Sequence, residues 1–199
     1  PGHAFNISHN TMAPDPGKFV CPWARSTTAG SGEGGNKFDL DKWNDDYFIR
    51  LKKFVAAAQQ RGIIVEFTFF CPFYEESQWL LSPMNHINNI NGVGNIARND
   101  AYTLDKNGAL LSIQEKMVKK IVNELKGFDN ILYEICNEPY FGGVTLEWQQ
   151  HIASVINKAE SNFLLKHLIT QNIANGHSKI EKPFSEVSVF NFHYAMPPV

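Results

Sequence analysis

The stretch that decides the fold is Ile131-Leu132-Tyr133-Glu134-Ile135-Cys136-Asn137-Glu138-Pro139, a short apolar run that stops on a carboxylate. A strand buried in a parallel sheet is almost continuously hydrophobic, and this run has that character. Pro139 cannot donate a ladder hydrogen bond and disfavours a helical residue before it, so the strand must end near Glu138. Parallel α/β folds bind ligands at the carboxyl ends of their strands. Glu138 is therefore the first candidate for a functional carboxylate.

Helices and strands are predicted to alternate around this stretch. The predicted strands, all short apolar or β-branched runs, are 63–70, 131–138, 168–172 and 187–194. The predicted helices, each with apolar residues at helical spacing, begin at Asn44, at the capping box Ser112-Ile113-Gln114-Glu115 and near Thr145. Such alternation predicts a parallel sheet with right-handed crossovers. An open doubly wound sheet and part of a barrel both satisfy it.

Two long segments have little periodicity. Residues 1–37 are predicted to be irregular, and the cluster Gly30-x-Gly32-x-Gly34-Gly35 to be a flexible loop. A phosphate-binding loop is disfavoured because no strand leads into the glycines and no helix follows them. Residues 71–108 form a connection rich in Asn and Gly, and loops of that length tend to be functional or disordered.

Composition excludes several classes of protein. The chain has 199 residues, 43% of them hydrophobic and 19% charged, which predicts one globular domain over residues 1–199. A net charge of -2 does not favour nucleic acid, and no apolar run approaches the ~20 residues that span a bilayer. The three cysteines and the histidines show no ligand spacing, so neither a metal nor another cofactor is expected. The oligomeric state stays open, as does the compartment, for which we favour a secreted or periplasmic location.

Glu138 at a strand end can act as a general acid and base if burial raises its pKa toward about 6–7. The alternative is a structural ion pair or a carboxylate at a helix start. Asn137 would bind a substrate hydroxyl beside the acid, or else make a local bond to the backbone.

These residues resemble a known family. Asn137-Glu138-Pro139 at the end of a fourth strand, with His193-Tyr194 at the end of a sixth, is similar to the clan A glycoside hydrolases, above all their cellulase-like branch. The lead-in Phe38-Asp39-Leu40-Asp41-Lys42-Trp43-Asn44 is similar as well, so the resemblance covers most of residues 23–194. It implies a (β/α)₈ TIM barrel, present in part from about the second-strand loop through the sixth strand. It also implies a retaining hydrolase of a β-linked oligo- or polysaccharide, with Glu138 as acid/base.

Further residues are candidates for substrate binding. Asn137, His193 and Tyr194 would line the subsite around the cleaved bond, if a twist or bulge turns both strand-end residues inward; otherwise Tyr194 packs behind His193. The aromatic residues predicted near the strand ends, which suit stacking on sugar rings or ordinary packing, are Trp23, Trp79, Tyr140 and Phe141. Arg25 would orient a carboxylate or stay solvated.

Two features depart from the family pattern. The third strand ends in Cys71-Pro72, where the family often has a histidine, and no seventh strand supplies the nucleophilic glutamate before Val199. The substitutes considered and set aside, being mid-strand, at the wrong strand end or in a loop, are Glu66, Glu134, Glu186, Glu75 and Glu76. We therefore expect the nucleophile downstream and the 199 residues alone to be inactive. A carbohydrate-binding pseudoenzyme, or an α/β enzyme of other chemistry, is the alternative.

Overall fold

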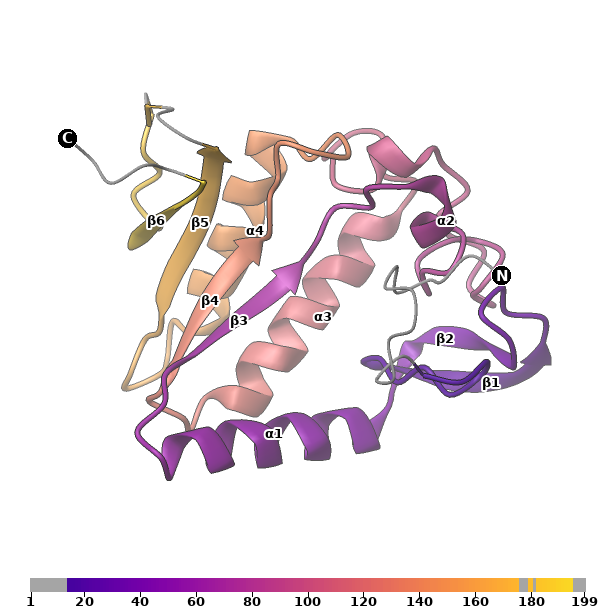
Figure 1. Ribbon diagram of the computed structural model, residues 1–199, viewed down its shortest axis with the longest axis horizontal. Coiled ribbons are helices and arrows are strands. Elements are labelled where there is room, and N and C mark those ends of the chain that lie inside the picture. Colours follow the sequence, from indigo (N-terminus) through magenta and orange to yellow (C-terminus); the bar gives the residue numbers. More distant parts are fainter. Residues whose placement is uncertain (1–13, 176–178, 181, 195–199) are drawn as a thin grey trace.

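The centre of the fold is a parallel sheet of four strands in sequence order (Figure 1). The computed structural model describes residues 14–175, 179–180 and 182–194. The strands of the sheet are β3 (Val65–Phe70), β4 (Ile131–Cys136), β5 (Leu168–Asn175) and β6 (Val189–His193). The four predicted strands are confirmed, although β5 runs beyond its predicted end.

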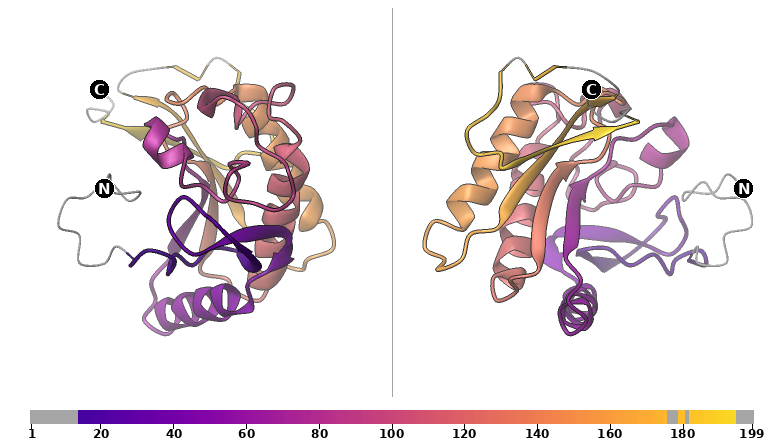
Figure 2. Two further views of the ribbon diagram at one scale, coloured as in Figure 1. Left: turned by 90° about the vertical axis from the view of Figure 1, so that its right-hand side faces the viewer. Right: turned by 60° about the vertical axis from the view of Figure 1, so that its left-hand side comes forward.

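The helices show which α/β architecture this is. Helix α3 (Leu110–Leu125) leads from β3 to β4, and α4 (Leu146–Ala159) leads from β4 to β5. Both lie on one face of the sheet, while α1 (Asp45–Gln59) lies below β3 and beside α3 (Figures 1 and 2). A doubly wound sheet has helices on both faces and a reversal of strand order. The structure is therefore a partial α/β barrel, and the open-sheet alternative is wrong.

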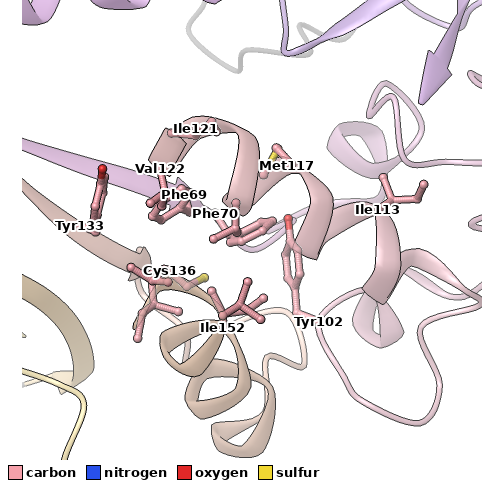
Figure 3. Packing of buried hydrophobic residues seen from close by; sticks show 14 of the residues in the cluster. Phe69, Phe70, Tyr102, Ile113, Met117, Ile121, Val122, Tyr133, Cys136 and Ile152 are labelled. Atoms are coloured by element: carbon pink, nitrogen blue, oxygen red, sulfur yellow. The ribbon is translucent and has the colours of Figure 1, made fainter. Parts of the chain in front are cut away.

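The core lies between the sheet and helices α3 and α4 (Figure 3). The ring of Phe70 on β3 packs edge-on against Trp148 of α4, with centroids 5.0 Å apart. Thr145 caps α4 as predicted, because its side chain accepts from the Trp148 amide at 3.2 Å. The predicted capping box of α3 is wrong: this helix begins at Leu110, so Ser112 already lies in its first turn.

Residues 1–13 of the predicted irregular segment lie outside the described residues. Residues 14–37 are not irregular throughout, because an antiparallel hairpin of β1 (Trp23–Ala29) and β2 (Asn36–Trp43) begins within them. The cluster of glycines is the turn of this hairpin, since Gly34 and Gly35 have φ of 92° and 82°. The Gly30 amide donates to the Gly35 carbonyl at 3.0 Å and closes the turn. The glycines therefore connect two paired strands and do not belong to one long irregular connection, which corrects that part of the prediction.

The connection between β3 and α3 is ordered by buried asparagine side chains. It contains a short α2 (Glu76–Trp79) and a 3₁₀ turn, η1 (Arg98–Asp100). The Asn88 amide donates to the carbonyls of Leu80 and Ser82 at 2.8 Å, and its Oδ1 accepts from the Gly32 amide at 2.7 Å. These bonds replace a regular ladder and attach the connection to the turn of the hairpin.

Candidate active site

Glu138 lies two residues beyond β4 in a left-handed backbone conformation, with φ of 41°. The ladder continues one residue past the strand, because the Asn137 amide donates to the Phe70 carbonyl at 3.0 Å. Positive φ is uncommon for a residue with a side chain, and such conformations cluster at functional sites. The turn ends β4 and places the Glu138 side chain between the ends of β3 and β6.

The carboxylate of Glu138 has hydrogen-bond partners in the loop after β3 and at the end of β6. The Tyr74 hydroxyl, in the loop after β3, donates to Oε2 at 2.9 Å. Nδ1 of His193, the last residue of β6, lies 3.0 Å from Oε1. Tyr140, two residues beyond Glu138, contributes a further hydrogen bond. The Glu138 side chain is 15% exposed, so it is partly buried yet open to a ligand.

The pKa of Glu138 is held below its usual range. The hydrogen bond from His193 is the largest cause; burial opposes it, and the bonds from Tyr74 and Tyr140 add to the lowering. Burial therefore does act to raise this pKa, as considered from the sequence, but the net shift is downward in the arrangement described. Donors outweigh desolvation, because each one stabilises the charged form of the carboxyl group.

The arrangement of Asn137 and Glu138 at one strand end coincides with a family match. The family model for Cellulase (glycosyl hydrolase family 5) matches residues 19–194. The chain belongs to glycosyl hydrolase family 5. A solved structure from Bacteroides vulgatus ATCC 8482, described as a candidate glycoside hydrolase, is similar in fold, with a TM-score of 0.57 and 16% identity. The similarity covers 87% of this chain and 29% of that one, so the family 5 chain spans under a third of its neighbour's length. The sequence matches none of the curated proteins.

Three more of the predicted site residues of this family 5 chain lie beside Glu138. The side-chain amide of Asn137 donates to the Tyr74 hydroxyl at 3.0 Å. His193 and Tyr140 contact the Glu138 carboxylate directly. Tyr194 is 80% exposed, has φ of 53°, and meets the His193 ring edge-on at 6.0 Å. Its ring therefore touches His193 only at an edge and is otherwise open to solvent, which is neither the inward nor the packed position that was predicted.

Three predicted substrate-binding residues serve the fold instead. Trp23 and Trp79 are 4% and 1% exposed, so neither ring offers a face to a sugar. Arg25 forms an ion pair with Glu33 at 2.5 Å and donates to the Asn36 carbonyl at 2.7 Å, both within the hairpin. These predictions are corrected. The sequence could not separate packing from stacking for the tryptophans, or a hairpin clamp from a ligand contact for the arginine.

Sequence reasoning missed Tyr74, the hydroxyl that joins Asn137 to Glu138. The thiol of Cys71 also points at this hydroxyl, at 3.7 Å. A usable signal was present, because Cys71-Pro72-Phe73-Tyr74 directly follows β3 and so lies at the carboxyl end of the sheet.

The glutamates considered as substitute nucleophiles all have other partners. Glu134, 4% exposed, accepts from Thr68 at 2.6 Å, and Glu66 accepts from Thr170 at 2.7 Å; these bonds lie on the polar face of the sheet. Burial raises the pKa of Glu134. The other substitutes have partners away from Glu138: Glu75 caps α2, Glu76 pairs with Arg98, and Glu186 binds Ser154 and Asn157 of α4.

An open pocket of about 370 Å³ adjoins the site, with Cys71, Tyr74, Gln78 and Phe19 in its lining. A larger pocket, of about 490 Å³, lies over α1; it shares Phe19 with the first pocket but includes none of the residues that contact Glu138. Within residues 14–175, 179–180 and 182–194, no three His, Cys, Asp or Glu side chains are grouped to hold a metal ion. None of the helices in that described part is long and apolar enough to span a bilayer.

Proposed function

We propose that the protein is a retaining glycoside hydrolase that cleaves O-glycosidic bonds of a β-linked glycan, with Glu138 as its general acid and base. The observation that carries the proposal is the strained turn that fixes a partly buried carboxylate between two oriented donors, Tyr74 and His193. Membership of glycosyl hydrolase family 5 supports the same chemistry. The substrate is an oligo- or polysaccharide.

Glu138 would first protonate the leaving oxygen and then, as a carboxylate, remove a proton from the attacking water. The retaining route also needs a nucleophilic carboxylate about 5–5.5 Å from the first. The glutamates discussed above are engaged elsewhere, so the proposal takes this group from a part of the protein after residue 199. Asn137 would hydrogen-bond a sugar hydroxyl beside the cleaved bond. The pocket lined by Tyr74 and Phe19 lies within the usual size range of ligand sites, about 300–1,000 Å³.

The test is hydrolysis of aryl β-glycosides and β-linked oligosaccharides by the full-length natural protein and its Glu138→Gln variant. Loss of the acid/base should lower kcat by about 10²–10⁴-fold on unactivated oligosaccharides. The matched control is Glu186→Gln, the same change at a side chain that binds Ser154 and Asn157 of α4 and does not contact Glu138, which should keep most of the activity. Equal rates in wild type and Glu138→Gln would exclude the proposal.

The stereochemistry of the product tests the retaining mechanism separately. Proton NMR of the first turnover should show the β-anomer before it equilibrates. The α-anomer as first product would contradict a retaining route and leave an inverting one.

A carbohydrate-binding pseudoenzyme is the second candidate, and the lowered pKa of Glu138 favours it. A permanent carboxylate can accept hydrogen bonds from sugar hydroxyls without transferring a proton. Glycan binding by calorimetry with no detectable turnover in the full-length natural protein would support this function over the first.

A further inference from the structure

The hydroxyl of Tyr74 has its hydrogen-bonding capacity completely used. The side-chain amide of Asn137 donates to this hydroxyl at 3.0 Å, and the Cys71 thiol donates to it at 3.7 Å. Both acceptor positions of the hydroxyl oxygen are therefore taken. A tyrosine hydroxyl has one proton to donate, and the remaining partner, Glu138 Oε2 at 2.9 Å, can only accept. The direction of this hydrogen bond is therefore fixed by its neighbours.

The loop that carries Tyr74 is held in place on several sides. The Tyr74 amide donates to the Gln78 side chain at 2.7 Å, and its ring meets Phe141 edge-on at 5.6 Å. The buried Tyr102 hydroxyl donates to the Cys71 carbonyl at 3.1 Å and anchors the start of the loop. The position of the donor is thus set before any ligand arrives, which lowers the cost of orienting the carboxylate.

We propose that Tyr74 is a positioning residue that orients the Glu138 carboxylate and tunes its acidity; this rests on the proposed acid/base role. The two oxygens of Glu138 are divided between two strand ends, with Oε1 toward His193 and Oε2 toward Tyr74. With the further hydrogen bond from Tyr140, three of the about four lone-pair positions of the carboxylate are occupied, and the remaining one can hold the proton that goes to the glycosidic oxygen or comes from the water. Fixing both oxygens selects one orientation of the carboxyl group for proton transfer.

Several titratable groups act on Glu138 or on its partners. They are His193 on β6, Tyr74 and Cys71 after β3, Tyr140 in its own segment, and Glu134 on β4, which acts on His193 and Cys71. Burial is the main cause that raises the pKa of Tyr74 above its usual range. Tyr74 therefore stays a proton donor across the pH range in which Glu138 titrates.

Removing the Tyr74 hydroxyl should make Glu138 a weaker acid. A donor to the charged form of a carboxyl group lowers its pKa, so deleting that donor raises it. Protonation of the leaving group needs protonated Glu138, and its ionisation in the free enzyme gives the alkaline limb of kcat/KM. In Tyr74→Phe this limb should therefore move to higher pH, by about 0.5–1 unit.

The experiment compares pH profiles of kcat/KM for wild type, Tyr74→Phe and Tyr133→Phe in the full-length natural protein. Tyr133→Phe is the matched control, because it removes a buried hydroxyl of β4 that has no hydrogen-bond partner among the described residues. The proposal predicts an upward shift in Tyr74→Phe and an unmoved limb in Tyr133→Phe. An unmoved or lowered limb in Tyr74→Phe, or equal shifts in both variants, overturns it.

A second variant covers the case in which Tyr74→Phe fails to fold. Site-specific 3-fluorotyrosine at position 74 keeps the size of the ring and makes the hydroxyl a stronger donor. The limb should then move to lower pH, opposite to the change in Tyr74→Phe. An unmoved or raised limb contradicts the positioning role.

Failure of this inference can be told apart from failure of the proposed function. If Glu138→Gln keeps full activity, the acid/base role itself is wrong, whatever Tyr74 does. If Glu138→Gln is inactive while the Tyr74 variants leave the profile unmoved, only the role of Tyr74 is wrong.

Discussion

Glu134 and Glu138 follow one another on the same segment of chain, yet their surroundings differ in kind. Glu134 lies within β4, is 4% exposed, and accepts a hydrogen bond from Thr68. Burial raises its pKa, and the charge of Glu66 adds to this. Glu138 lies beyond the strand, where hydrogen bonds from His193, Tyr74 and Tyr140 hold its pKa below the usual range.

The difference shows what the end of a strand contributes to chemistry. Within β4, Glu134 is surrounded by the sheet, and the neighbouring strand β3 supplies one hydroxyl and a second carboxylate. Beyond the strand, Glu138 is reached by loops from β3 and by the end of β6. Donors, rather than the type of residue, decide which carboxyl group is held as an oriented anion.

The largest expected effect comes from a third carboxylate, Glu160, which is as buried as Glu134 but has a cation beside it. His167 Nδ1 lies 2.5 Å from Glu160, and its Nε2 lies 2.6 Å from the Phe128 carbonyl. The bond to Glu160 raises the pKa of His167 from 6.5. His167→Ala should lower the free energy of unfolding by about 3–5 kcal/mol at about pH 6, measured in urea, because it leaves a buried charge unpaired.

The pH dependence of the wild type follows from the same shift. Because the pKa of His167 is raised in the folded protein, its contribution to the free energy of unfolding is fully present below pH 6.5. This contribution is lost as the pH rises through the pKa of His167 in the folded protein. The control is His151→Ala at the half-exposed pair with Glu115, which should cost about 1 kcal/mol or less. Equal losses of unfolding free energy in the two variants would show that burial does not increase the contribution of a histidine–glutamate pair to stability.

His193→Gln should have the second largest effect, because it removes the largest contribution to the lowered pKa of Glu138. The pKa of Glu138 should rise, and misorientation of the carboxylate should lower kcat/KM by up to about 10²-fold. Steady-state kinetics of the full-length natural protein measures this. An unchanged kcat/KM would show that catalysis does not depend on the contact between His193 and Oε1 of Glu138.

Glu134→Gln reverses the comparison by removing the charge at the buried position. A carboxyl group whose pKa is raised gives stability below its unfolded pKa and loses it as pH rises through the folded one. The free energy of unfolding of the variant, relative to that of wild type, should therefore increase from about pH 4 to about pH 7. The expected increase is about 1 kcal/mol, the scale of one hydrogen bond. Urea unfolding at both pH values measures it, and a gain that shrinks as pH rises would contradict the sign.

The smallest effect is expected from Tyr140→Phe. Among the three hydrogen bonds that lower the pKa of Glu138, that of Tyr140 ranks after those of His193 and Tyr74. The pKa should rise less than in Tyr74→Phe, with the carboxyl carbon of Glu138 followed by NMR. A larger rise than in Tyr74→Phe would reverse the order of the donors.

Much of this fold could be predicted because its signals are local. The apolar run of β4 and its stop at Pro139 place Glu138 at a strand end without any long-range information. Helical spacing identified α1 and α4, and Thr145 marked the start of α4. Helix α3 was predicted to begin too late, because Ala109 enters it through a left-handed conformation, with φ of 68°, and not through a side-chain cap.

The parts that were missed depend on contacts between distant residues. The hairpin is fixed by Arg25 with Glu33 and by strand pairing, so it needs no continuous apolar run. The connection after β3 is ordered by Asn88 reaching backbone groups far away in sequence. Tyr74 meets Glu138 only because β3 and β4 are neighbours in the sheet, and the sequence alone does not give that register.

The most direct test of the account is a carbon-13 NMR titration of the glutamate carboxyl groups in the full-length natural protein. Glu134→Gln and Glu138→Gln assign the two signals by their absence. We predict that Glu138 titrates below the ordinary glutamate value of 4.5 and Glu134 above it. Equal pKa values, or the reverse order, would contradict the claim that donors at the strand end set Glu138 apart.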